Sequence, residues 1–417
     1  MAAANSLDPA GVLLAGVVLV IPQSDCESLR ASPSAAGGGV STVAAALDRA
    51  VDVPGVSRGQ TGVVVVELSS STVIYALNPD TPLEPASTEK LPVAAAALQR
   101  LGGGFRTRTR VLGRGTLSGT TWRGDLFLKG YGDPGLTSTG LTGLARAIRA
   151  RGITTVNGRV VGDESYFDAE RTVVGWKPSF AKTESPLLSA LVVNRGILDG
   201  AAVDHPALAA AILFTRALER AGVSVAARPT VGRATSTAVE LTRRASAPLQ
   251  TLLSQMDTWS DNFIAEMLLK SLGAGLTGRG TSSAGVAAVR TALAADGVPL
   301  RGVRLADGSG LSSLDRLTAR SLAAILETVA HEPDLRPLLS TFAIAGSTGT
   351  LRRRLVDVPG HRIVTGKTGT TDHASALAGF VGSKFAFAIL NNGSPVDWQA
   401  AHRLQDRVAE TLLAAAA

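Results

Sequence analysis

The sequence predicts an α+β protein whose main domain is an antiparallel sheet flanked by helices and built from both ends of the chain. Two β-branched strand patterns lie near the N-terminus, three lie near the C-terminus, and apolar helices lie between them. A middle stretch of short strands, broken by Gly, Asp and Pro, interrupts this order. We therefore expect one domain from residues 41–104 plus 245–417, with one or two inserted α+β modules over residues 105–244.

The N-terminal part of the main domain is predicted to be a hairpin followed by a helix. Two runs rich in Val, Ile and Thr, at 61–68 and 72–77, are joined by a turn of three serines. A short helix over 43–51 is expected before them. Pro85 opens a helix that ends at three consecutive glycines, because Pro fits the first helical turn and Gly fits the position after the last one.

The remaining elements follow from the same patterns of apolar spacing and turn residues. The middle stretch is expected to hold strands near 108–113, 124–130 and 157–163, helices at 140–150 and 208–221, and two strand-like stretches before 244. The C-terminal part is expected to hold helices at 249–256, 263–272, 282–296, 317–332 and 398–416, and strands at 362–367, 375–381 and 385–390.

Composition narrows the function classes. The chain has 417 residues and a net charge of +7, and its single cysteine rules out an intrachain disulfide. The run Arg352-Arg353-Arg354 has no aromatic residues interleaved with it, which argues against a nucleic-acid surface. The five histidines have no metal-ligand spacing, and the sequence has no phosphate-cradling loop. We therefore expect no nucleic-acid partner, no metal and no cofactor.

An apolar run near the N-terminus predicts export. Residues 11–21 contain no polar side chain, and the run is shorter than the roughly 20 residues that a membrane span needs. A Gly/Ala/Ser-rich spacer follows it, so we expect residues 1–40 to be a secretory leader and spacer. A buried strand of the mature fold is the alternative for this run. Membrane contact is expected at most through the leader.

Three short motifs carry the functional signal. They are Ser87-Thr88-Glu89-Lys90 at the start of the first long helix, Ser260-Asp261-Asn262 in the link between two helices, and Lys367-Thr368-Gly369 at the end of a strand. Each motif alone is weak. A second Ser-x-x-Lys occurs at Ser179-Phe180-Ala181-Lys182, for example, where we expect a loop. All three motifs in this order and in these contexts indicate nucleophilic acyl transfer.

The residue types explain the chemistry expected of Ser87 and Lys90. Residues three apart on a helix lie on one face, so the two side chains can share a hydrogen bond. A serine hydroxyl attacks only after a base removes its proton, and lysine is that base when burial or a nearby cation lowers its pKa. Lys367 is expected to supply the cation. The backbone N–H groups of Ser87 and Thr370 are expected to form an oxyanion hole.

The other motif residues are expected to relay protons and to hold the substrate. The Ser260 hydroxyl can pass a proton to a leaving amine, and the Asn262 carboxamide can clamp a peptide amide. A substrate carboxylate and an extended substrate backbone are expected to bind at the strand edge, at Lys367, Thr368, Gly369 and Thr370.

The three motifs resemble those of penicillin-binding proteins and serine β-lactamases. Five further segments resemble class C low-molecular-mass penicillin-binding proteins, the D-alanyl-D-alanine carboxypeptidase/endopeptidases: GDPGLTSTGLTGLARAIRARGI, NGRVVGDESYFD, LADGSGLS, GTLRRRL and KTGTTDHASALAGF. The resemblance covers the chain from about Thr61 to the C-terminus. It implies a β-lactamase/transpeptidase-like domain with extra domains inserted between the first and second motifs.

The resemblance also implies an activity. It implies an exported bacterial enzyme of the periplasm or cell wall that hydrolyses D-Ala-D-Ala bonds of peptidoglycan stem peptides through an acyl-enzyme on Ser87, with Lys90 as general base. β-Lactam antibiotics would acylate the same serine. Proton relay and substrate holding would fall to Ser260, Asn262 and Lys367, and the terminal carboxylate and oxyanion hole to Thr368 and Thr370.

Two alternatives share the fold. A serine β-lactamase would need fast deacylation, and the nearest match to the class A deacylation motif is Glu184-Ser185-Pro186-Leu187-Leu188, which lacks the Asn. A non-catalytic cell-wall-binding protein would not need the complete motif set. Neither the balance of carboxypeptidase and endopeptidase action nor the oligomeric state follows from the sequence.

Overall fold

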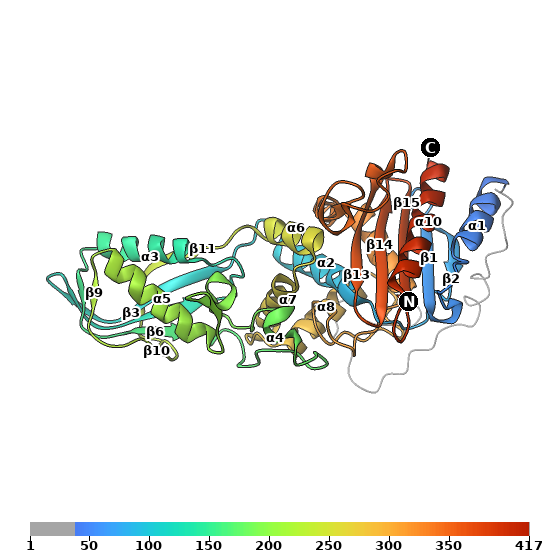
Figure 1. Cartoon of the computed structure of the whole chain (residues 1–417). Helices are drawn as coiled ribbons and strands as arrows, with labels where there is room; N and C mark the ends of the chain where they lie inside the picture. The colour runs from blue at the N-terminus through green and yellow to red at the C-terminus, as the bar shows by residue number, and fades with distance from the viewer. Residues whose placement is uncertain (1–37, 417) are drawn as a thin grey trace, which may run out of the picture. The chain divides into compact units, whose positions relative to one another are not determined.

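Strands from the two ends of the chain pair into one antiparallel sheet, as the sequence predicts (Figure 1). The computed structural model describes residues 38–416. The six strands follow the order β12-β13-β14-β15-β1-β2. Their bounds are β1 (Thr61–Glu67), β2 (Thr72–Leu77), β12 (Ala343–Ile344), β13 (Val364–Thr370), β14 (Ala374–Val381) and β15 (Phe385–Asn392). The expected α+β class with its antiparallel sheet is therefore confirmed.

Both faces of this sheet are buried, and alternating side chains of one strand reach two different cores. Val64 and Val66 of β1 belong to one core, and Val63 and Val65 belong to the other. The first core is filled by α2 (Lys90–Leu101), α6 (Leu249–Trp259), α7 (Asn262–Thr277), α8 (Ser282–Ala295) and α9 (Ala319–His331). The second is covered by α1 (Gly38–Ala50) and α10 (Trp398–Ala416). Burial on both faces explains why inner strands such as β1 and β15 contain nearly unbroken apolar runs.

The middle stretch folds around a sheet of its own. Its main order is β10-β6-β4-β3-β11, and β5 and β9 extend it beside β4. The strands are β3 (Arg108–Ser118), β4 (Thr121–Gly130), β5 (Thr155–Val156), β6 (Val160–Asp163), β9 (Ser224–Val225), β10 (Thr230–Val231) and β11 (Val239–Ala245). Two helices, α3 (Ser138–Ala150) and α5 (Pro206–Arg220), pack on this sheet through a core of their own. The domain boundaries at residues 105 and 244 stay a prediction.

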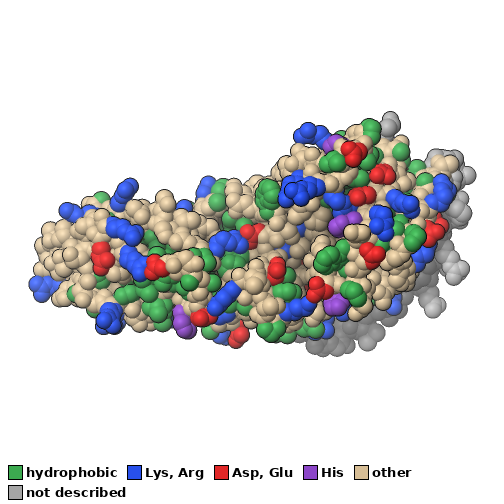
Figure 2. Space-filling model, in the orientation of Figure 1, with side chains coloured by type: hydrophobic (Ala, Val, Ile, Leu, Met, Phe, Trp, Pro, Cys, Tyr) green, Lys and Arg blue, Asp and Glu red, His purple; other side chains and the backbone are tan. Residues whose placement is uncertain are grey.

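The middle stretch is also the basic part of the chain. Residues 105–244 contain 20 Lys and Arg against 11 Asp and Glu, whereas the whole chain has a net charge of only +7. Figure 2 shows basic side chains distributed over the face that carries β3, α3 and α5. The remaining residues are therefore slightly acidic, and the positive charge belongs to the middle stretch.

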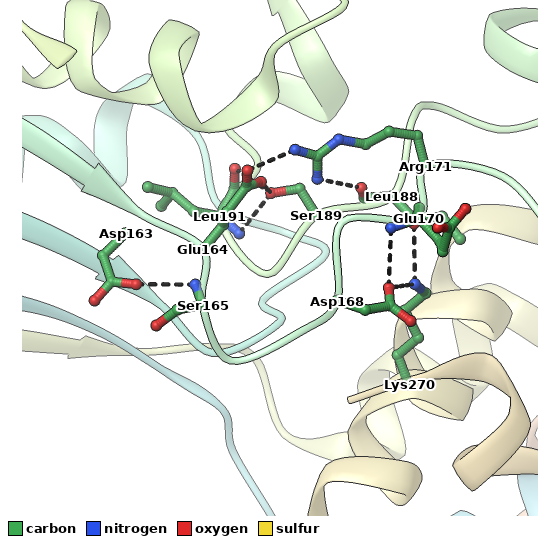
Figure 3. A network of polar contacts seen from close by, with 10 residues as sticks. All are labelled: Asp163, Glu164, Ser165, Asp168, Glu170, Arg171, Leu188, Ser189, Leu191 and Lys270. Atoms are coloured by element: carbon green, nitrogen blue, oxygen red, sulfur yellow. Dashed lines mark hydrogen bonds and ion pairs between the residues drawn. The ribbon is translucent and has the colours of Figure 1, made fainter. Parts of the chain in front are cut away.

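The loop after β6 joins this stretch to α7 (Figure 3). The buried Lys270 ammonium forms an ion pair with Asp168 and donates to the Glu170 carbonyl. Apolar contacts reinforce the connection, because Phe167 packs in one small core with Phe263 of α7. A buried pair that loses one partner leaves an uncompensated charge, so this anchor fixes the loop on α7. From Thr42 on, the chain forms a single compact unit.

Several predicted boundaries are wrong by a few residues, and three of these corrections affect the site. The first long helix is preceded by a 3₁₀ turn, Ala86–Glu89, and its α-helical part begins only at Lys90. Helix α6 continues to Trp259, three residues beyond the predicted end at Met256. Strand β13 continues to Thr370, so the Lys-Thr-Gly motif lies inside the strand.

The other corrections concern short elements. Strand β12 was not predicted, and the stretch before residue 244 holds three strands after α5 instead of two. Strands of two residues are too short to show an alternating pattern, which explains these omissions. The leader predicted over residues 1–40 lies outside the described residues except from Gly38, where α1 begins. Between residues 38 and 416, no helix is long and apolar enough to cross a bilayer.

Candidate active site

The turn that carries Ser87 is held in an unusual backbone conformation. Ala86 has φ 47°, a left-handed value that costs energy for a residue with a side chain. Two glycines allow the turn to be packed closely. A Cβ on Gly310 would lie 1.9 Å from the Ala86 carbonyl oxygen, and one on Gly369 would lie 3.0 Å from the Ser87 backbone nitrogen. Strand β13 therefore approaches Ser87 backbone to backbone, which explains the glycine of the third motif.

Lys90 lies at the centre of the three motifs. Its ammonium nitrogen Nζ is 2.9 Å from Ser87 Oγ, 2.8 Å from Asn262 Oδ1 and 2.6 Å from the Ser309 carbonyl oxygen. The residue is fully buried. The spacing of Ser87 and Lys90 thus gives the predicted hydrogen bond, although the serine lies on the 3₁₀ turn and the lysine on α2.

Burial lowers the pKa of Lys90, which favours the neutral amine that a base requires. Desolvation lowers its pKa to about 8, against the opposing effect of the negative charges of Asp307 and Glu266. Lys367 does not appear among the main causes of this shift. The repulsion between the two lysines is mutual, and the pKa of Lys367 is lowered by burial first and by the Lys90 charge second. The expected depression of the Lys90 pKa is present, and burial is its largest cause.

The second and third motifs meet at Ser260 and Lys367. Lys367 Nζ is 2.8 Å from Ser260 Oγ and 2.8 Å from the Thr368 carbonyl oxygen, and the lysine is fully buried. Ser260 ends α6 in the left-handed region, with φ 62°, a position that usually takes Gly. The structure therefore keeps a hydroxyl at a strained helix end, where it accepts a hydrogen bond from Lys367.

Asn262 is placed by the start of α7. Asp261 caps this helix by accepting from the Ile264 backbone N–H, and it forms an ion pair with Arg195 of the middle stretch. The Asn262 amide donates to the Glu184 carbonyl while its oxygen accepts from Lys90. The loop of the middle stretch thus contributes to one wall of the site.

Strand β13 offers an open edge next to Ser87. Its neighbour β12 pairs only with Thr365 and Gly366, and no other strand among residues 38–416 covers this edge from Lys367 to Thr370. The Thr368 hydroxyl donates to the Thr350 hydroxyl at 2.7 Å, and Thr370 is exposed. Unpaired backbone groups on such an edge can pair with an extended peptide.

Sequence reasoning missed a buried loop that orients Lys90. The Asp307 carboxyl oxygens accept from the backbone N–H groups of Ser309, Gly310, Leu311 and Ser312 and from the Trp176 indole. Glu266 of α7 accepts from Gly308 and Ser309. These bonds present the Ser309 carbonyl to Lys90. The sequence offered one signal, because Asp-Gly-Ser-Gly is a turn pattern whose Asp side chain bonds backbone N–H groups two and three residues on.

A second missed residue is Asp257. It lies one turn before Ser260 on α6, is fully buried, and accepts a hydrogen bond from the Thr341 hydroxyl. Burial raises its pKa to about 7, while the positive charges of Lys367 and Lys90 act in the opposite direction. The apolar pattern predicts the end of this helix at Met256, so the sequence places Asp257 in a link.

Replacing Asp307 by Asn should move the acidic limb of the kcat/KM–pH profile to lower pH. The Asp307 charge raises the pKa of Lys90, and a neutral amide removes that effect, so Lys90 stays uncharged at lower pH. The loss of loop hydrogen bonds should also reduce kcat/KM about tenfold or more, since groups that orient a catalytic residue typically matter at this level. The full pH profile of peptide hydrolysis measures both effects.

Asp315→Asn is the matched control for this experiment. Burial raises the pKa of Asp315 to about 12, so this carboxyl carries no charge at the assay pH. The control should leave the acidic limb in place even where it lowers the melting temperature. Identical profiles for Asp307→Asn and the native protein would show that Asp307 does not act through Lys90.

Comparison with known proteins agrees with this geometry. The model of the D-Ala-D-Ala carboxypeptidase 3 (S13) family matches residues 43–200 and 197–415. A D-alanyl-D-alanine carboxypeptidase of Actinomadura sp. strain R39 is 29% identical over 92% of this chain and 87% of its own length. A carboxypeptidase of Mycobacterium tuberculosis is 32% identical over 89% of this chain and 83% of its own length.

A solved structure shows the same fold. Penicillin binding protein 4 of Haemophilus influenzae superposes with a TM-score of 0.78 at 25% identity, covering 90% of this chain and 99% of that protein. The resemblance inferred from the three motifs is thereby confirmed. The chain belongs to the D-Ala-D-Ala carboxypeptidase 3 (S13) family and is a serine-type carboxypeptidase.

Proposed function

We propose that Ser87 is the nucleophile and Lys90 the general base of a DD-peptidase that acts on peptidoglycan stem peptides. One observation carries the assignment. A fully buried lysine with a pKa of about 8 bonds Ser87 Oγ at 2.9 Å, and its hydrogen-bond partners within the described residues include no carboxylate. A base with a pKa near the working pH combines the neutral form with useful proton affinity.

The reaction proceeds through an acyl-enzyme. Ser87 Oγ attacks the carbonyl carbon of the penultimate D-Ala while its proton passes to Lys90 Nζ. The proton then passes from Lys90 through the Ser260 hydroxyl to the nitrogen of the terminal D-Ala, the C–N bond breaks, D-Ala leaves as an amine, and Lys90 is neutral again. Water attacks the ester while Lys90 takes its proton. That proton returns to Ser87 Oγ as the ester bond breaks, which releases the shortened peptide and regenerates Ser87.

The open edge of β13 holds the substrate in this proposal. An extended peptide adds to the strand beside Gly369, while Lys367 and the hydroxyls of Thr368 and Thr370 bind its terminal carboxylate. The backbone N–H groups of Ser87 and Thr370 receive the developing oxyanion. Support comes from the close packing of Gly369 against the Ser87 turn and from the Lys367–Ser260 contact.

The proposed activity requires release of D-Ala. An acylated Lys-D-Ala-D-Ala tripeptide should lose its terminal D-Ala, whereas the same peptide ending in L-Ala should remain intact. Mass spectrometry of the products gives the answer directly. A protein that folds normally and leaves the D-Ala peptide whole would disprove the proposal.

β-Lactams are expected to acylate Ser87 and to be released slowly. A related structure of penicillin binding protein 4 from H. influenzae is complexed with a β-lactam. The β-lactamase alternative needs a second base for rapid deacylation, and Glu184 is its sequence candidate. Glu184 contacts the site through its backbone carbonyl, and its side chain is exposed. Slow turnover of nitrocefin by the native protein is therefore the expected result, and rapid turnover would favour the alternative.

Location and domain organisation complete the proposal. An enzyme of this specificity meets its substrate outside the cytoplasm, so we place it in the periplasm or cell wall, exported by the leader at residues 1–40. Residues 41–104 and 245–417 form the catalytic domain, and residues 105–244 are the inserted part. The separate sheets of these two regions support this division.

A further inference from the structure

We propose that a cavity between β3 and α7 binds a carboxylate-bearing saccharide strand at a distance from the reacting bond. The cavity has a volume of about 490 Å³, within the usual range for ligand sites. Its lining combines three arginines, two tyrosines and a helix residue, namely Arg106, Arg108, Arg110, Tyr131, Tyr166 and Ser271. None of these residues takes part in the proposed reaction.

Three arginines line one side of the cavity. Arg106, Arg108 and Arg110 are spaced two apart, so in extended backbone they point to the same face, while Thr107 and Thr109 between them are buried. The guanidinium of Arg106 donates to the Ser246 carbonyl, and neither Arg106 nor Arg108 has an acidic partner among residues 38–416. Two guanidinium groups thus face the cavity with their charge uncompensated.

The tyrosines give the site flat apolar surfaces. The rings of Tyr131 and Tyr166 lie 4.9 Å apart, and the Arg110 guanidinium lies 5.1 Å above the Tyr131 ring. No hydrogen bond of either tyrosine hydroxyl occurs within the described part of the chain. Arg110 is ion-paired with Glu240, so a ligand carboxylate would bind the guanidinium groups of Arg106 and Arg108. The tyrosine ring faces would pack on the apolar C–H groups of a sugar ring.

The position of the cavity connects it to the catalytic residues. Ser271 in its wall and Asn262 in the active site both belong to α7, nine residues apart, which corresponds to about 14 Å along the helix. The Asp168–Lys270 ion pair beside it fixes the Tyr166 loop on the same helix (Figure 3). One polymer strand can therefore span both sites.

The charge distribution favours an anionic occupant. Most of the cavity lining comes from residues 105–244, which contain 20 basic against 11 acidic residues. A glycan strand with stem-peptide carboxylates offers sugar rings and negative charge together, whereas a polyol phosphate chain offers charge without rings. This inference rests on the proposed function, because it identifies the occupant as part of the polymer that carries the scissile peptide.

Binding to purified peptidoglycan tests the proposal. The native protein should cosediment with peptidoglycan stripped of accessory polymers, and the affinity should fall with salt. The double variant Arg106→Gln/Arg108→Gln should bind about a hundredfold more weakly, since each charge-assisted hydrogen bond accounts for about tenfold. Arg108→Glu should weaken binding further by charge reversal. The control Arg228→Gln/Arg233→Gln loses the same charge from exposed residues outside the cavity and should bind like the native protein.

Hydrolysis of the short tripeptide separates this proposal from the proposed function. The Arg106→Gln/Arg108→Gln variant should cleave the tripeptide at the native rate, even where loss of the Arg106–Ser246 hydrogen bond lowers its melting temperature. Unaltered binding by this variant, or equal binding of the native protein to poly(glycerol phosphate), would overturn the saccharide site while leaving the peptidase intact. If the native protein binds peptidoglycan but does not cleave the tripeptide, the result would instead count against the proposed function alone.

Discussion

Ser87→Ala is expected to lower kcat/KM for D-Ala release by about 10⁶-fold, the scale found when a serine nucleophile is removed. The reason is geometric, because Ser87 Oγ is the hydroxyl that lies 2.9 Å from the buried base. Ser260 Oγ lies against Lys367 instead. Initial rates with the acylated tripeptide, measured at several enzyme concentrations to exclude contaminating activity, give the loss.

Ser179→Ala is the matched control for Ser87→Ala. Ser179 begins the second Ser-x-x-Lys of the chain, whose lysine is exposed and bonds Asp204 at 2.6 Å. The backbone of this segment leaves the helical region at Ala181 and Lys182, which agrees with the predicted loop. The control should keep native activity. An active Ser87→Ala protein, or an inactive Ser179→Ala protein, would assign the nucleophile to the wrong motif.

The pH dependence of kcat/KM is expected to follow the titration of Lys90. Burial lowers the pKa of this lysine to about 8, and only the neutral amine accepts the serine proton. Below that pKa the neutral fraction falls tenfold per pH unit, so kcat/KM should fall about tenfold between pH 7 and pH 6. It should level off above pH 8. The sign follows from the role of a base, which is lost as it becomes protonated.

Lys90→Arg tests the same residue by substitution. A guanidinium keeps the positive charge but does not deprotonate in this range, so activity should fall by about 10³-fold or more. Lys182→Arg changes the lysine of the second Ser-x-x-Lys and should leave the activity unchanged. A profile that stays flat from pH 5 to pH 8, or substantial activity in Lys90→Arg, would remove Lys90 from the role of base.

The sequence predicted the class, the family and the enzyme type because these depend on patterns that recur locally. The β-branched residues predict strands such as Val63–Val66. The number and position of the predicted strands near the two ends of the chain indicated that these strands pair in one sheet. The residues named for the site also lie together in the structure, with Ser87, Lys90 and Asn262 joined by hydrogen bonds. Their catalytic roles stay predictions until the variants are measured.

The features of the site that the sequence did not predict depend on contacts between residues far apart in the chain. Asp307 is recognisable as a turn residue, but the sequence does not show that its loop ends against Lys90, 217 residues earlier in numbering, or that Trp176 bonds it from the middle stretch. The Ala86 and Ser260 conformations are likewise set by close packing. The predicted end of α6 is wrong because its last turn, up to Trp259, contains Asp257, a buried polar residue that the apolar pattern does not assign to the helix.

Covalent labelling with penicillin, followed by fragmentation of the labelled peptide, tests the central claim most directly. The account predicts one adduct per chain, located on Ser87, formed faster as the pH rises toward 8 and absent from Ser87→Ala. An adduct on Ser260 or Ser309, or continued labelling of Ser87→Ala, would contradict it.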